Sequence, residues 1–411
     1  MGISFMIKRE KYFNIINEFI DTNFIKIFTG IRRSGKTTLL HSIIDELEEK
    51  GVKKENIFYF SFESIKYQDI TTSKKLNELI LGVCDDITDK VYLLFDEIQL
   101  VKNWEKSING FYTDLNCDIY ITGSNSMLLS GEYATLLSGR YIQIDVYPFS
   151  FKEFLQYYSE VKKLELTDTI EKELFEEYLE FGGMPGILEL NDKQAKKAVL
   201  KDIYASIVYN DIFGRYTIKK MDLFKRFANY IMNTMGETFS SKSITNYLKN
   251  NTEKTSRNTI LNFTNYLENA YFISMLRRED IIGKKILSTE QKYYLMDHGF
   301  HNALIESNWT KQTHVIENIV YIELLRRGYE VKIGKIYDKE IDFLCKKDGN
   351  KCYIQVTWQL SSPETIEREI TPLLKVRDQY DKYIFSMDEH DMSQRGIKHE
   401  NIIEFLKNDD F

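Results

Sequence analysis

Two glycines five residues apart, followed by a lysine and two threonines, are the residues in this sequence best suited to chemistry. In the stretch FTGIRRSGKTTLL, residues 28 to 40, Gly30, Gly35, Lys36 and Thr37 fit the pattern G-x-x-x-x-G-K-[ST]. Glycines let backbone N–H groups turn inward around a polyphosphate, and the start of a helix adds favourable dipole charge. We expect Lys36 to reach the β- and γ-phosphates of a nucleotide and Thr37 to place its hydroxyl on Mg²⁺.

Such a loop needs a strand before it and a helix after it, and the flanking sequence predicts both. Residues 25 to 29, IKIFT, are an apolar β-rich run, and residues 36 to 48 carry apolar side chains at helical spacing. A chance match in a glycine-containing turn would lack this context. The predicted nucleotide-binding loop consists of Gly30, Ile31, Arg32, Arg33, Ser34, Gly35, Lys36, Thr37 and Thr38.

A second strand, VYLLFDEIQL at 91 to 100, carries two carboxylates, Asp96 and Glu97, after its apolar run. Ligands of open α/β sheets lie at the carboxyl ends of strands, so both acids are expected beside the loop. Asp96 is suited to hold the Mg²⁺ shell, and Glu97 to activate the water that attacks the γ-phosphate. The alternative is an acid pair that merely caps the next helix.

Two further strands add candidate catalytic residues. CDIYITGSNS at 117 to 126 contains Ser124 and Asn125, which could sense the γ-phosphate or hold the attacking water, or could simply form a turn. YIQIDV at 141 to 146 is preceded by Arg140, which is expected near the same edge of the sheet. An arginine can stabilise transition-state charge in cis or from a neighbouring subunit of a homo-oligomer, although Arg140 could also be a surface residue.

Composition indicates a folded chain with several hydrophobic cores. The 411 residues are 43% hydrophobic and 28% charged, with only 4 prolines, and exceed what one core supports. The net charge of -7 argues against coating nucleic acid by bulk charge but leaves room for a local basic face. Four cysteines lack paired or CxxC spacing, which predicts reduced thiols and no zinc site. No signal peptide or membrane-length apolar run is evident, so we expect a cytoplasmic protein.

These motifs together resemble the bacterial and archaeal AAA-type ATPases that carry a C-terminal domain of unknown function related to restriction endonucleases. The resemblance rests on GIRRSGKTTLL, LLFDEIQ followed by Trp104, YITGSNSMLLS, LSGR followed by PFSFKEF, FGGMP at 181 to 185 and YNDIFGR at 209 to 215. It implies ATP as the nucleotide, Lys36 and Thr37 at phosphate and Mg²⁺, Asp96 and Glu97 at metal and water, and Arg140 as a finger or sensor.

The remaining chain is predicted to hold three regions after an ATPase core at 1–150. Residues 151–235 read as helices rich in Phe, Tyr and Leu, which form a core or a lid. Residues 236–310 resemble a winged helix, with a modest surplus of basic residues between Gly236 and Lys285. Its reading helix would offer Ser256, Arg257, Asn258 and Asn262 to DNA, although winged helices also pack against proteins.

Residues 311–411 resemble the core of the PD-(D/E)XK nucleases. Asp342 fits the first acid of that motif and Glu317 lies on the preceding helix, but Gln355 and Thr357 stand where a glutamate and a lysine are needed. A neutral amide is a poor ligand for a hard divalent metal. We therefore expect an α/β chain with a P-loop ATPase core, a winged-helix middle and an inactive nuclease-like end. The function that we expect is Mg²⁺-dependent ATP hydrolysis or ATP-gated switching, coupled to recognition of nucleic acid or protein. An ATP-dependent metal nuclease and a non-hydrolysing ATP-binding scaffold are the alternatives.

Overall fold

The computed structural model describes residues 7–126, 137–250, 255–281, 291–305, 312–409 and 411. Chain contacts divide it into two compact units, one formed by residues 1–148 with 269–271 and the other by residues 149–268 with 272–411. The first boundary lies close to the predicted end of the ATPase core. The finer division of residues 151–411 into three domains stays a prediction.

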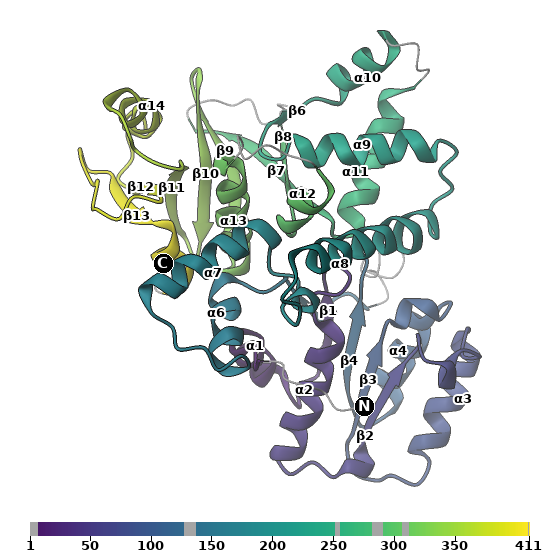
Figure 1. The fold of residues 1–411 in the computed structure, drawn as a ribbon. Helices are drawn as coiled ribbons and strands as arrows, with labels where there is room; N and C mark the ends of the chain where they lie inside the picture. The colour runs from purple at the N-terminus through teal and green to yellow at the C-terminus, as the bar shows by residue number, and fades with distance from the viewer. Residues whose placement is uncertain (1–6, 127–136, 251–254, 282–290, 306–311, 410) are drawn as a thin grey trace. The chain divides into compact units, whose positions relative to one another are not determined.

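The first unit is built around a five-stranded, wholly parallel sheet in the order β2-β3-β4-β1-β5. Figure 1 shows β4, β3 and β2 side by side, with α3 and α4 along one flank. The four strands expected from the sequence and the helix after the glycine loop are all present. The elements are α1 (Glu10–Phe19), β1 (Ile25–Thr29), α2 (Lys36–Glu49), β2 (Ile57–Ser61), α3 (Ser73–Cys84), β3 (Val91–Asp96), α4 (Trp104–Asp114), β4 (Cys117–Gly123) and β5 (Tyr141–Asp145).

Hydrophobic clusters cover both faces of this sheet. Successive side chains of a strand point to opposite faces, so Ile27 of β1 joins a cluster with α3 and α4. Its neighbour Phe28 joins a second cluster with α1 and α2. Because both faces are covered, the central strands β1 and β3 are buried along their whole length.

The second unit combines helices with an eight-stranded mixed sheet in the order β13-β12-β11-β10-β9-β7-β8-β6. Its helices are α6 (Phe151–Glu160), α7 (Asp168–Phe181), α8 (Lys193–Ser206), α9 (Met221–Asn233), α10 (Ser241–Asn250), α11 (Arg257–Asn269), α12 (Gly299–Leu304), α13 (Gln312–Arg326), α14 (Pro363–Leu374) and α15 (Ile402–Lys407). Its strands are β6 (Thr238–Phe239), β7 (Ile273–Asp280), β8 (Gln291–Leu295), β9 (Glu330–Ile336), β10 (Lys339–Lys347), β11 (Asn350–Val356), β12 (Asp381–Ser386) and β13 (Lys398–Asn401).

One strand pairing makes this sheet continuous across the regions that the sequence suggested were separate. β7 pairs in parallel with β9, with Arg278 opposite Ile333 and Asp280 opposite Lys335. Ion pairs of Glu279 stabilise this pairing of β7 with β9, since its carboxylate accepts from Lys332 Nζ at 2.9 Å and from Lys346 Nζ at 2.7 Å. Among the helices that the structure describes, none is long and apolar enough to cross a membrane.

Candidate nucleotide-binding site

The glycine loop between β1 and α2 has a backbone that requires its two motif glycines. Gly30 has φ 144° and Gly35 has φ 97°, conformations that residues with a Cβ rarely adopt. A Cβ on Gly30 would also lie 2.2 Å from the carbonyl oxygen of Val146. The sequence pattern therefore corresponds to a real steric demand at the carboxyl end of β1.

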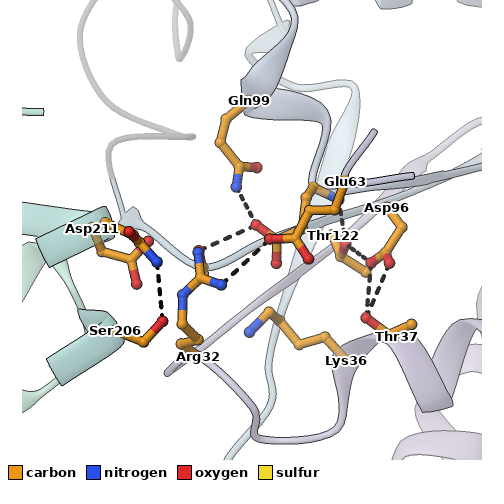
Figure 2. Close-up of polar contacts among 12 residues, drawn as sticks. Arg32, Lys36, Thr37, Glu63, Asp96, Gln99, Thr122, Ser206 and Asp211 are labelled. Carbon is orange, nitrogen blue, oxygen red and sulfur yellow. Dashed lines mark hydrogen bonds and ion pairs between the residues drawn. The ribbon is translucent and has the colours of Figure 1, made fainter. Parts of the chain in front are cut away.

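The motif lysine and threonine lie where the motif requires them. Lys36 is buried, and its Nζ donates to the carbonyl oxygens of Gly30 and Ile31, both at 2.9 Å. Thr37 Oγ1 donates to the Asp96 carboxylate, 3.1 Å from Oδ1 and 3.0 Å from Oδ2 (Figure 2). The glycine loop and the carboxyl end of β3, which carries Asp96, thus lie in direct contact.

The other predicted loop residues divide into buried and exposed groups. Ile31 and Ser34 are buried, Thr38 is partly buried, and Arg33 is exposed with φ 64°. Arg32 is partly buried, and its guanidinium lies 3.3 Å from Glu63 Oε1. The burial of Ile31 and Ser34 makes them supports of the loop, while Arg32 and Arg33 have side chains that can face a ligand.

Asp96 is held by three hydroxyl groups from different elements. Besides Thr37, Thr122 of β4 donates to its Oδ1 at 2.6 Å (Figure 2). Tyr59 of β2 donates to its Oδ2 at 3.0 Å. These hydrogen bonds hold the carboxylate in one orientation. A threonine hydroxyl beside a fixed carboxylate is a donor set that suits a hard cation such as Mg²⁺.

Glu97 follows β3 in the left-handed conformation, with φ 54°. Its backbone N–H donates to Thr122 Oγ1 at 3.0 Å, and Ser124 Oγ donates to its Oε2 at 3.2 Å. Burial raises the pKa of the Glu97 carboxyl, and the positive charge of Lys36 only partly opposes this effect. The carboxylate is consequently a better proton acceptor than an exposed glutamate.

Gln99 is a site residue that the sequence analysis did not single out. Its Nε2 donates to Glu97 Oε2, while its buried Oε1 has no hydrogen-bond partner in the part of the chain that the structure describes. The only signal in the sequence was its position two residues after Glu97. Its amide therefore restrains the carboxylate that is predicted to activate water.

Strand order explains why Ser124 and Asn125 reach the same site. β4 lies between β1 and β3, so the residues that follow it lie between the loop and the two acids. Both residues are fully buried. The roles proposed for them stay predictions.

The expected place of Arg140 was wrong. β5 runs parallel to β1 with Tyr141 opposite Ile25 and Asp145 opposite Thr29, so Arg140 precedes the amino ends of both strands. Five residues at about 3.3 Å each put it roughly 16 Å from the loop. Its guanidinium instead donates to Asn109 Oδ1 and lies 5.2 Å from the centre of the Tyr112 ring. In a parallel sheet, residues that precede a strand lie at the amino edge, and residues that follow a strand lie at the opposite, carboxyl edge. Arg140 therefore cannot reach the nucleotide-binding loop of its own subunit.

The second unit holds a separate group of buried charges around the nuclease-like motif. Lys292 of β8 places its Nζ 3.0 Å from Glu317 Oε1, 2.8 Å from Glu340 Oε1 and 3.8 Å from Asp342 Oδ1. Burial alone would lower the pKa of Lys292, but the three carboxylates outweigh it and raise that pKa. Because Lys292 lies far from the motif in sequence, no local pattern could have revealed it.

The motif residues surround this ammonium group. Asp342 Oδ2 accepts from the Val356 backbone N–H at 2.9 Å, and Gln355 Oε1 lies 3.4 Å from the Asp342 backbone nitrogen. Thr357 is buried, and Glu364 is exposed at the start of α14. The described residues contain no group of three or more His, Cys, Asp or Glu side chains arranged to hold a metal ion. An ammonium group thus occupies the centre of these carboxylates.

The four side chains predicted to read DNA lie together around the start of α11. Ser256, Arg257, Asn258 and Asn262 are all exposed. The buried face of α11 packs against α9, where the Phe263 ring lies 5.2 Å from that of Phe224. Their proposed role in reading DNA stays a prediction.

Two family models match different parts of the chain. A model described as an AAA domain matches residues 22–155, and a model for a domain of unknown function, DUF8612, matches residues 172–312. The second match covers the helical and middle regions rather than the nuclease-like end. The AAA match includes every residue described above for the nucleotide-binding site between the glycine loop and the acids that follow β3.

Relatives cover most of the chain. An uncharacterized protein from Haemophilus influenzae is 38% identical over 402 residues, which are 98% of either protein. The uncharacterized protein MJ1544 from Methanocaldococcus jannaschii is 35% identical over 360 residues, covering 85% of this chain and 77% of that protein. The Walker-type ATPase PABY2304 of Pyrococcus abyssi shares the fold with a TM-score of 0.50 at 15% identity, covering 74% of this chain and 98% of its own.

Proposed function

This chain belongs to one family with its Haemophilus influenzae and Methanocaldococcus jannaschii relatives and contains an AAA-type ATPase domain, and we propose that it hydrolyses ATP with Mg²⁺. The observation that carries the proposal is the bond between the Thr37 hydroxyl and the Asp96 carboxylate, with Glu97 next in sequence. Asp96 and Glu97 lie at the carboxyl end of β3, and Thr37 lies at the start of the helix after the loop that follows β1, which is the edge where α/β sheets bind nucleotides.

Each residue of the site has a distinct part in the proposed reaction. The loop N–H groups and Lys36 bind the terminal phosphates, and Thr37 and Asp96 would hold Mg²⁺, which neutralises charge on the phosphate oxygens when bound. Glu97 accepts a proton from water as the water oxygen bonds to the γ-phosphorus and the bond to the β–γ bridging oxygen breaks. The raised pKa of Glu97 supports its role as the proton acceptor.

An arginine that stabilises the transition state would then come from a neighbouring copy of the chain. Arg140 lies at the amino edge of the sheet, which favours action in trans over action in cis. We propose a homo-oligomer in which Arg140 of one subunit approaches the nucleotide of the next. Its stacking on Tyr112 supports this role because it restrains the guanidinium at that edge.

The second unit would couple the nucleotide state to recognition of nucleic acid or protein. Two features support the winged-helix assignment. Along the chain the elements follow in the order β6, α10, α11, β7, β8, and β8 pairs with β7 on one side and β6 on the other. A helix α13 followed by the β9–β10–β11 antiparallel ladder supports the nuclease-like assignment of the C-terminal region. Lys292 at the centre of its carboxylates favours recognition or structure there over metal-dependent cleavage.

The test is phosphate release measured with wild type beside Glu97→Gln and Lys36→Ala. We expect Glu97→Gln to bind ATP normally and to hydrolyse it at least about a hundredfold more slowly, because the amide keeps the shape and cannot accept the proton. Lys36→Ala should lose both binding and turnover. Lys50→Ala, at an exposed position after α2, is a matched control that should retain both. Wild type that binds ATP tightly without releasing phosphate would instead support the scaffold.

A further inference from the structure

The α10–α11 region differs in charge from the rest of the chain. The described residues 238–250 and 255–267 contain no Asp or Glu, although acidic residues outnumber basic ones in the whole chain. Lys242 and Lys249 of α10 and Arg257 of α11 are all exposed. This region is therefore locally positive in a protein of net charge -7.

The exposed face of α11 consists mainly of amide side chains. Arg257, Asn258, Leu261, Asn262 and Asn265 are exposed, and their spacing places them on one side of the helix. The opposite side, with Ile260, Phe263 and Leu267, is buried. Protein–protein interfaces are enriched in aromatic residues and methionine, and the five exposed residues named on α11 include neither.

Arg257 is held in place at the start of this face. Its Nε donates to Ser241 Oγ of α10 at 3.1 Å, and Ser241 is itself buried. The bond uses Nε, so it does not involve the terminal nitrogens of the guanidinium, which lies at the end of α11 that a recognition helix turns toward bases. The two helices are thus linked by a polar contact at the exposed face.

We propose that this face, defined by Arg257, Asn258, Asn262 and Asn265, binds the major groove of duplex DNA and reads adenine-containing sites. An asparagine amide can donate to and accept from the adenine N6 and N7 together, and an arginine can donate two hydrogen bonds to guanine. Lys242 and Lys249 contact phosphates beside the groove. This proposal rests on the proposed function, because it names the partner to which ATP hydrolysis is coupled.

The experiment is selection from a random-sequence pool of labelled DNA duplexes, followed by fluorescence anisotropy with the full chain. We expect selected duplexes to share adenines at fixed positions. Asn262→Ala should reduce the preference at one position about tenfold. Lys249→Ala should weaken binding to all duplexes alike and reduce the slope of log affinity against log salt by about one. Asn229→Ala, an exposed asparagine on α9, is the matched control and should bind as wild type does.

Phosphate release measured on the same samples separates the two proposals. If wild type hydrolyses ATP but binds no duplex even at low salt, the DNA proposal is overturned and the ATPase proposal stands. The DNA proposal also fails if a triple Asn258, Asn262 and Asn265 to Ala variant binds duplexes as tightly as wild type. If neither wild type nor any variant binds DNA, and the same substitutions disrupt a complex with a protein, the face would be assigned to protein recognition instead.

Discussion

Replacement of Lys292 by methionine should destabilise the second unit strongly at neutral pH. The side chain is buried, and its ammonium lies within 3.0 Å of carboxylate oxygens of both Glu317 and Glu340. Methionine has a similar length but no charge, so it would leave these acids without their cation. Removing one partner of a buried ion pair typically costs about 3–5 kcal/mol, much of it because the remaining charge stays buried.

The cost of Lys292→Met should depend on pH with a definite sign. Burial alone would raise the pKa of Glu317, but Lys292 and the neighbouring donors lower it to about 2. A carboxyl whose folded-state pKa is depressed stabilises the fold above its unfolded pKa of about 4.3, and this contribution is lost as pH falls toward 2. Without Lys292 that contribution disappears. The difference in unfolding free energy between wild type and variant should therefore stay nearly constant from pH 7 to about pH 5 and shrink as pH falls from about 4.3 toward 2.

The assay is urea unfolding from about pH 2 to 7, with hydrogen exchange of peptides from β8 and α13 to assign the transition to the second unit. Lys332→Met is the control, because Lys332 forms ion pairs of similar length with Glu279 and Glu330 but is only partly buried. We expect the control to cost no more than about 1 kcal/mol. An equal effect of both substitutions at neutral pH, or a pH-independent effect of Lys292→Met, would refute the reasoning.

Four other substitutions or assays follow from the structure. Arg140→Ala should lower turnover about a hundredfold with little change in ATP affinity, and in mixtures with wild type the turnover should fall faster than the fraction of variant if Arg140 acts in trans. Gln99→Ala should lower kcat more than it changes KM, because it frees the Glu97 carboxylate from a fixed position; equal changes in both would assign Gln99 to binding. Gly30→Ala should abolish ATP binding in a filter assay, since its Cβ would lie 2.2 Å from a carbonyl oxygen, and normal binding would contradict this. Purified protein should not cut DNA or RNA with Mg²⁺ or Mn²⁺, whereas cleavage that vanishes in Asp342→Ala would establish a nuclease.

The sequence predicts the first unit well because its signals are local. The glycine loop, the apolar run before it and the helix after it occupy adjacent residues, and each requirement of the motif is visible within them. The position of the acids at the end of β3 is predicted for the same reason. A buried parallel strand appears in the sequence as one continuous apolar run, and the residues that follow this run mark its carboxyl end. Arg140 was expected at the wrong edge because a residue that precedes a parallel strand lies at the amino edge of the sheet, whereas the loop and the acids follow their strands.

The second unit holds the features that local patterns could not predict. Lys292 and Asp342 meet only because β8 and β10 belong to one sheet, and no spacing in the sequence encodes this contact. The pairing of β7 with β9 also joins strands separated by two helices and a further strand. Such contacts depend on the whole fold, and their partners can be identified only once the strand order is known.

The pairing of β7 with β9 bears on how this chain can change during evolution. A deletion that removed everything from β9 onward would discard a segment whose motif lacks a glutamate and a lysine. It would also leave Arg278, Glu279 and Asp280 on an exposed strand edge with unpaired backbone groups, which promotes aggregation. Selection would then keep the segment for the edge it covers, even in lineages where it performs no chemistry of its own.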